Sequence, residues 1–488
     1  MRTYPWRFFG RPDTGASDVP VAAGATGAVG ATEPAPASVD PPGARTADTS
    51  GPLRAALTRA VVAEPWVAPL AALILLCAPN LLVWPAALVG VLPSLGRLLT
   101  TGRLWRATPF DLPLLLLTVG ALLGGYASLS RDGAFIRLTG LLAGFLLFAA
   151  LREHAGGERA LRRLVLGLLV AAVASSVLLL VLVGPFLLLE RVPPLAAAVS
   201  AIDRWRLGDW FSDQDWLLQR YRFRASGVGA LADVGLALAT AALVGLRGIR
   251  GRVLVALSVP FFLVVLLVAD NRGAMLAGTL TLGAMATVWR RRLLPLVPIV
   301  VVLGLLVLAF GPVDRGLSLK TLAQRFWFWE NSVYLAREVP FTGAGLGLES
   351  VQLVYRAYFQ PSYPPFSHAH NIYLQGLLEY GVFGLLGLLG LGLATLWAGW
   401  RVGGAGRDES RWTTAGRLAG FGMAMAMLTT GLTEIVLLST LGGALVLAAV
   451  GLLAATTRAG GGGCAPPPNT HAPPRGRRPP PPPGAGGG

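Results

Sequence analysis

Long apolar runs alternate with short arginine-bearing linkers along most of this sequence. The runs are roughly 17–22 residues long, and a helix needs about 20 residues to cross the hydrocarbon core of a bilayer. The pattern therefore predicts an all-α polytopic membrane protein of about twelve transmembrane helices. They lie near residues 63–79, 81–98, 111–128, 134–151, 163–184, 226–246, 252–269, 273–289, 293–311, 372–399, 414–433 and 436–456. The first two, separated by Pro79 and Asn80, are short enough to form a re-entrant pair instead.

The distribution of arginine predicts how these helices are oriented. Each linker that follows an even-numbered span carries several arginines, whereas the short linkers of opposite parity carry only Arg131 and Arg272. Cytoplasmic linkers are enriched in arginine and lysine, so we expect both termini to be cytoplasmic. Two long linkers, about 186–226 and 312–371, then lie on the outer face, and linkers of this length are more often functional than passive.

The terminal regions have a different composition and set the expected domain boundaries. Residues 1–60 are rich in Ala, Gly, Pro and Thr and contain no apolar segment of the kind found in a cleavable signal peptide, which predicts a disordered cytoplasmic arm. Residues 458–488 are a Pro/Gly-rich stretch that cannot form a core. We therefore expect one transmembrane domain, residues 61–457, between two disordered cytoplasmic segments.

Composition and charge agree with a membrane protein. The chain is 54% hydrophobic and only 14% charged, with a mean hydropathy of +0.61, whereas soluble domains carry about 25% charged residues. The net charge of +16 comes mostly from arginines in short linkers, which argues against nucleic acid as the partner. The two cysteines cannot build a disulfide framework and do not have the spacing of a metal site.

Two of the four histidines stand together in the segment FSHAHNIYLQ, at the outer end of the tenth predicted span. His370 can be a helix-capping or interfacial residue, or a metal ligand with His368 and either Glu349 or Glu379. It can also be a general base, because an ordinary imidazole has a pKa of about 6.5 and takes up a proton near neutral pH. The residues alone leave these three interpretations open.

Arginines at the outer ends of neighbouring spans indicate what such a base could act on. Arg272 lies in a very tight linker, and Arg222 and Arg224 precede the sixth span. Charge at this depth is costly, and a guanidinium offers paired donors that suit phosphate or pyrophosphate, although snorkelling to lipid headgroups is the alternative. Asp213 and Asp215 in the first long linker are more typical of solvated charges than of a metal site.

The segment PFTGAGLGLES contains three glycines spaced by single residues. It is not a dinucleotide-binding fingerprint, because no strand precedes it. We expect either a tight turn that brings backbone close to a substrate or a purely structural loop.

Three separated motifs resemble the O-antigen ligase and O-antigen polymerase superfamily of integral membrane glycosyltransferases. HNIYLQGLLEYGVFG resembles its His-Asn motif followed by a Gly-x-x-Gly pair, and RFWFWENSVYLAREVPFTGAGLG is similar to the stretch upstream of it. NRGAMLAG and RASGVG resemble the arginine-glycine elements of the central helices. The matching positions are His370, Asn371, Gly381, Gly384, Arg325, Trp329, Pro340, Gly343, Gly345, Arg272 and either Arg222 or Arg224.

This resemblance implies a metal-independent transfer, without cofactors, of a glycan from undecaprenyl diphosphate to an acceptor hydroxyl. In ligases the acceptor is a lipid A-core sugar, and in polymerases it is another carrier-linked glycan. His370 would be the general base, Arg272 and Arg224 (or Arg222) would bind the diphosphate, and Arg325 would be a further contact. Supporting positions would be His368, Asn371, Glu379, Gly381 and Gly384.

Two other classes of function compete with this one. Arginines at helix ends also serve transporters of anionic solutes, but such proteins place charges near the bilayer midplane in two repeated halves, and no repeat is evident here. A non-catalytic scaffold for envelope assembly would not need His370. The sequence therefore favours an enzyme in the inner membrane, embedded in the lipid bilayer, with its active site on the extracytoplasmic side.

Overall fold

The protein is described here from a computed structural model, and the chain divides into two units, Met1–Ser50 and Gly51–Gly488. All elements below belong to the second unit. The structure describes residues 51–77, 82–103, 107–155, 157–182, 225–269, 271–296, 298–299, 302, 319–359, 368–402, 410–435, 438 and 440–459. Several predictions lie outside these residues, namely most of the arm, the tail beyond 459, Arg222, Arg224, Asp213, Asp215 and most of the ninth span.

The described residues form thirteen α-helices and one 3₁₀ helix, with no strand among them. The α-helices are α1 (Gly51–Cys77), α2 (Val83–Thr101), α3 (Asp111–Tyr126), α4 (Arg131–His154), α5 (Glu158–Leu182), α10 (Ala225–Gly245), α11 (Ile249–Ala269), α12 (Arg272–Trp289), α14 (Leu319–Glu338), α15 (Leu348–Tyr358), α16 (Ile372–Val402), α17 (Arg411–Thr430) and α18 (Thr440–Ala459). The 3₁₀ helix, η3, is Arg291–Leu296.

Every predicted span except the ninth coincides with one of these α-helices, and η3 stands where the ninth begins. In the part of the chain that the structure describes, seven helices are long and apolar enough to cross a membrane, among them both α1 and α2. The protein is therefore a multi-pass helical membrane protein, whereas the count of twelve spans stays a prediction. Helix α1 begins at Gly51, inside the predicted arm, because the Ala, Leu and Arg residues that precede the apolar run are strong helix formers.

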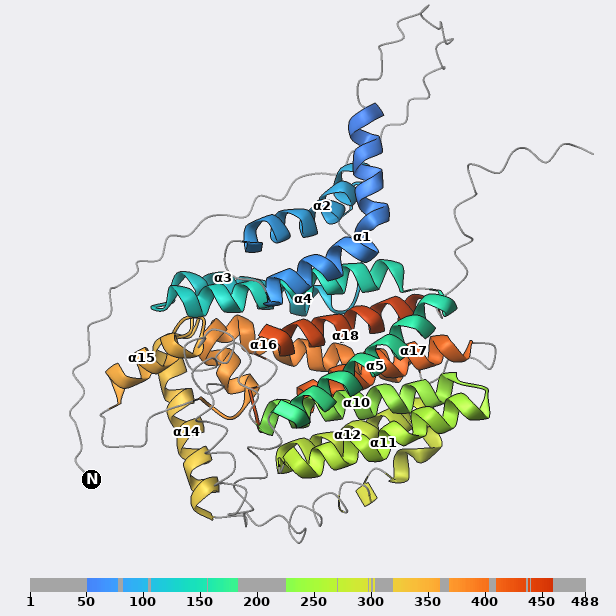
Figure 1. Ribbon diagram of the computed structural model, residues 1–488. Helices are drawn as coiled ribbons and strands as arrows, with labels where there is room; N and C mark the ends of the chain where they lie inside the picture. Colours follow the sequence, from blue (N-terminus) through green and yellow to red (C-terminus); the bar gives the residue numbers. More distant parts are fainter. Residues whose placement is uncertain are drawn as a thin grey trace, which may run out of the picture. The chain divides into compact units, whose positions relative to one another are not determined.

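Helix α10 packs among four other helices, α5, α11, α12 and α17 (Figure 1). Its sequence is rich in alanine and glycine, which lets neighbouring helices approach closely. At Gly235, for example, the ring of Phe262 occupies the space that a Cβ atom would need. Helix α11 is different, because Leu254, Leu257 and other large apolar side chains remain exposed, as expected for a face in contact with lipid.

The second long linker contains two helices, α14 and α15, which lie beside the start of α16 (Figure 1). They share a small apolar core of their own, in which Phe328, Leu335, Val351 and Tyr355 are buried. Burial raises the pKa of Tyr355 to about 12, although Asn331 donates a hydrogen bond to its hydroxyl oxygen at 3.1 Å. The described part of this linker is therefore a folded substructure that packs against the N-terminal end of α16.

Candidate functional site

The two histidines that precede α16 face each other. Their ring centroids are 3.9 Å apart and the planes are tilted by 42°; His368 is buried and His370 is half-buried. His370 has φ = 49°, the only positive φ of a non-glycine residue in the described part of the chain. The left-handed region costs an L-residue about 1–2 kcal/mol, so the surrounding contacts must hold this conformation.

The residue between the histidines, Ala369, is fixed from two sides. The indole Nε1 of Trp329, from α14, donates a hydrogen bond to the Ala369 carbonyl oxygen at 2.9 Å. The Ala369 N–H donates to Oε1 of Gln375, from α16, at 3.0 Å. Both backbone groups of the central residue are thus satisfied, which holds the backbone from which the two imidazoles project.

Asn371 caps α16, the helix that the sequence predicts from residue 372. Its side-chain oxygen accepts hydrogen bonds from the backbone N–H groups of Tyr373 and Leu374, at 2.9 and 3.1 Å. Such a cap satisfies helix donors that have no partner within the helix. The amide nitrogen of Asn371 also donates to the Leu432 carbonyl oxygen at 3.2 Å, which ties the start of α16 to the turn after α17.

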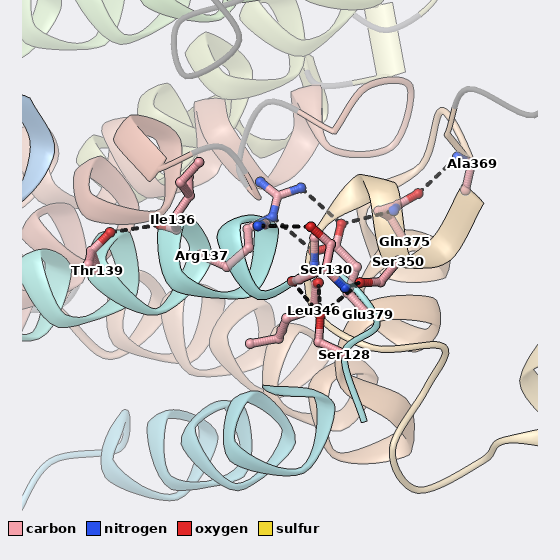
Figure 2. A network of polar contacts seen from close by, with 12 residues as sticks. Ser128, Ser130, Ile136, Arg137, Thr139, Leu346, Ser350, Ala369, Gln375 and Glu379 are labelled. Atoms are coloured by element: carbon pink, nitrogen blue, oxygen red, sulfur yellow. Dashed lines mark hydrogen bonds and ion pairs between the residues drawn. The ribbon is translucent and has the colours of Figure 1, made fainter. Parts of the chain in front are cut away.

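Glu379 is the centre of a buried polar network that reaches the histidine segment (Figure 2). Its carboxylate accepts two hydrogen bonds from the Arg137 guanidinium, from Nε and Nη2, both at 2.9 Å. It also accepts from Gln375 Nε2 at 2.9 Å and from the Gly347 N–H at 3.1 Å. Because Gln375 in turn accepts from the Ala369 N–H, one continuous path joins α4 to the segment that carries the imidazoles.

The carboxylates that sequence reasoning considered as partners of the histidines for a metal are engaged elsewhere. Glu379 is fully buried and committed to the Arg137 pair, and Glu349 accepts a hydrogen bond from the Ser130 hydroxyl at 2.6 Å. The carboxylate that does lie beside the histidines is Glu434. Nitrogen atoms of His368 and His370 and a carboxylate oxygen of Glu434 all lie within 4.8 Å of one another.

Sequence reasoning missed Glu434, since it follows a different span from His370. The one available signal was a carboxylate at the end of an apolar segment, where an ionisable group is costly. Arg325, from α14, faces the same group, with its Nη2 atom 4.0 Å from Glu434 Oε1. The sequence-predicted Arg325 and His370 are therefore brought together, through a residue that was not predicted.

The turn that carries Glu434 is held by the N-terminal ends of two helices. At the start of α16, the Ile372 N–H donates to the Gly431 carbonyl oxygen at 2.7 Å. At the start of α12, Gly273 leaves no room for a side chain because Thr433 packs directly against it. Arg272 is the first residue of α12 and is half-buried, so this arginine stands beside the turn that positions Glu434.

The spaced glycines form a structural loop wedged between helices. Gly343, Gly345 and Gly347 all have positive φ, and backbone atoms of Leu378, Ser128 and Gly133 occupy the places of their absent side chains. The loop is bonded on both sides, from the Ala344 N–H to Leu378 and from the Leu346 N–H to Gly124. Of the two interpretations of the glycine pattern, these contacts support the purely structural loop.

The glycines of the His-Asn motif have different positions in α16. Gly381 interrupts the helix with φ = 66° and accommodates the backbone of Phe341, and Val382 N–H donates to the Pro340 carbonyl oxygen at 2.7 Å. Gly384 is helical and lies against Gly120 of α3. Both glycines thus allow backbone segments to pack closely against α16 next to the Glu379 network.

Residues 255–389 match the family model described as O-antigen ligase. The matched segment contains Arg272, Arg325, His370, Gln375 and Glu379; it begins after Arg137 and ends before Glu434. No curated protein matches the chain. The comparison therefore shows a similarity to the O-antigen ligase family over residues 255–389, which supports the resemblance drawn from the sequence motifs.

Proposed function

We propose that this membrane protein is an O-antigen ligase-like glycosyltransferase that moves a glycan from undecaprenyl diphosphate to an acceptor hydroxyl. The observation that carries the proposal is the placement of His370 beside Arg325 and the α12 end that bears Arg272. The proposal assigns the base to His370 and the diphosphate contacts to Arg272 and Arg325, with Arg224 or Arg222 as the further arginine outside the described residues.

The electrostatics of this region suit a diphosphate. The N-terminal ends of α12 and α16 both abut the 431–434 turn, and a helix N-terminus carries the equivalent of roughly half a positive charge. An arginine at the first helical position is unfavourable for the helix itself, so Arg272 is better explained by an anion that it binds. Two guanidinium groups and two helix ends would stabilise the charge that develops on the leaving group.

The transfer can then proceed as a direct displacement. The acceptor oxygen attacks the anomeric carbon, the bond from that carbon to the diphosphate oxygen breaks, and the diphosphate leaves with the electron pair. His370 takes the proton of the attacking hydroxyl, a role typically worth about 10²–10⁴-fold in rate. Attack opposite the leaving group inverts the anomeric centre, and no metal or nucleotide takes part.

The backbone geometry supports His370 as the residue that acts. Its left-handed conformation is maintained by contacts to Ala369 and Asn371 rather than by preference, and strained positions of this kind cluster at functional sites. We place the site on the extracytoplasmic side of the inner membrane, with both termini cytoplasmic, in agreement with the arginine distribution.

The test uses the purified full chain in lipid nanodiscs, with a lipid-diphosphate glycan as donor and lipid A-core as acceptor. His370→Asn is the sharpest variant, because asparagine tolerates positive φ and only the base is lost. Transfer should fall at least 100-fold. Arg272→Lys keeps the charge but loses paired donation and should fall less.

His154→Gln is the matched control. His154 is the last residue of α4, whereas Arg137, which reaches the Glu379 network, lies near the start of that helix, and the His154 ring is hydrogen-bonded to Glu64. It should transfer at the wild-type rate. Full transfer by His370→Asn would refute the base assignment, and loss of transfer after exhaustive chelation would refute metal independence. A ladder of products in place of a single addition to lipid A-core would identify the polymerase alternative.

A further inference from the structure

We propose that His368, His370 and Glu434 also form a binding site for a divalent transition-metal ion of the zinc class, and that the bound ion inhibits transfer. Metal binding stands on the side-chain cluster alone. Only the inhibition rests on the proposed function, because it needs His370 to be the base.

The three groups supply two imidazole nitrogens and one carboxylate oxygen, a donor set common in metal sites with an open fourth position. Their donor atoms lie within 4.8 Å of one another. Around a tetrahedral zinc ion, with bonds of about 2.0–2.2 Å, neighbouring donors are about 3.3 Å apart. Side-chain rotations that move each donor by about 1 Å would therefore complete the site.

The histidine pair is already organised for such an ion. The rings face each other at 3.9 Å, and the residue between them is held by Trp329 and Gln375 through both backbone groups. Glu434 is on a turn whose backbone is fixed, since its N–H donates to the Thr430 carbonyl oxygen at 3.0 Å. Little ordering remains to be done on binding, which favours affinity.

The donor types select the ion. Imidazole nitrogen suits zinc, cobalt, nickel and copper, whereas magnesium and calcium prefer sites made of oxygen ligands. The ion would occupy the ring nitrogen electron pair that the base needs, so transfer would stop while the metal is bound. The open fourth position does not restore activity, because the proton acceptor itself is lost.

Substitution of Arg325 should change metal affinity in the direction opposite to substitution of a ligand, which provides a second test of the proposal. Its guanidinium lies 4.0 Å from Glu434 and competes with any cation for that carboxylate. Both side chains are largely buried, with 30% and 16% of their surface exposed, so the competition is only partly screened. Removing the guanidinium should tighten metal binding, whereas removing a ligand should weaken it.

The experiment is a Co²⁺ titration of the full chain in detergent, without any glycan, followed by the visible absorption of protein-bound cobalt and by displacement with Zn²⁺. We expect one equivalent of ion. His368→Gln and Glu434→Gln should each weaken binding at least about tenfold, comparable to or larger than the loss of an outer-shell partner. Arg325→Gln should tighten binding by about two- to fivefold, the range of a partly exposed ion pair.

His154→Gln should bind cobalt as the wild type does. Gel filtration and melting temperature verify that each variant is folded, and a gain in affinity for Arg325→Gln cannot arise from misfolding. The proposal is overturned if no cobalt absorption develops, if Glu434→Gln and His368→Gln bind like the wild type, or if His154→Gln removes the site.

A second arm measures transfer with added Zn²⁺. Inhibition of the wild type that chelation reverses, together with resistance of the residual activity of Glu434→Gln, supports the inhibitory role. Equal sensitivity of the two proteins overturns it. If the chain transfers no glycan at all, the proposed function fails, while the cobalt titration still decides whether the metal site exists.

Discussion

Replacing Glu379 by glutamine should lower the stability of the protein. The same change should loosen the hydrogen-bonded path that holds the backbone between His368 and His370. The substitution keeps the shape of the side chain but leaves the Arg137 guanidinium, whose side chain is 11% exposed, without its counter-charge. It also points an amide N–H₂ toward a donor, where two hydrogen bonds of 2.9 Å now run from Arg137. Breaking a buried ion pair in this way costs about 3–5 kcal/mol.

For a chain of this length, that loss corresponds to a fall of about 3–6 °C in apparent melting temperature. The assay is thermal unfolding in one detergent, followed by tryptophan fluorescence, for the wild type, Glu379→Gln, Glu379→Met, Arg137→Met and the double variant Arg137→Met/Glu379→Met. The double variant should melt above either single variant, because apolar replacement of both charges removes the uncompensated one.

A measurement of glycan transfer distinguishes the contribution of this network to stability from its contribution to activity. The double variant should regain stability but not the full rate, since Gln375 loses the carboxylate that its amide nitrogen bonds and then holds Ala369 less firmly. The reasoning is refuted if the single variants melt with the wild type, or if the effects of the two substitutions simply add. Additivity would mean that the two charges do not interact in the folded protein.

Three further predictions concern neighbouring elements. Gly381→Ala should destabilise the protein by more than about 1–2 kcal/mol because it adds a clash to a positive φ, whereas Gly392→Ala, in the same helix with open space around it, should be neutral or stabilising; thermal unfolding compares them. Trp329→Phe removes the hydrogen bond to Ala369 but keeps an aromatic ring, so transfer should fall about two- to tenfold in a steady-state assay. Burial favours the neutral phenol of Tyr355, so its contribution to stability is complete below pH 10 and is lost as the pH rises through its pKa of about 12; Tyr355→Phe should flatten the fall in melting temperature between pH 10 and 12.

The sequence predicted those features that local pattern determines. Apolar run lengths gave the helices, and Asn371 before an apolar run marked the start of α16, where its side chain does act as the cap. The arginine of α12 could be singled out because charge is rare at such a position. The family resemblance named His370, and the match to residues 255–389 supports that family.

The rest depends on contacts between distant segments, which no local pattern encodes. Nothing near Arg137 in the sequence points to Glu379, and nothing near His370 points to Glu434. The glycine loop shows the same limit, because its spacing is compatible with a turn near a substrate and with close backbone packing. Only the positions of Leu378, Ser128 and Gly133 distinguish the two.

At His370 the side chain proposed for catalysis and the backbone conformation favour different residues, because the left-handed conformation lowers stability for any residue with an ordinary side chain. Glycine or asparagine would adopt that conformation at less cost, yet neither carries an imidazole. Engineering that selects the protein for heat resistance alone would therefore tend to replace the very residue that we expect to be needed for transfer. Screens for more robust variants of this chain should accordingly retain His370 and look for stabilising changes elsewhere, such as exposed helical glycines.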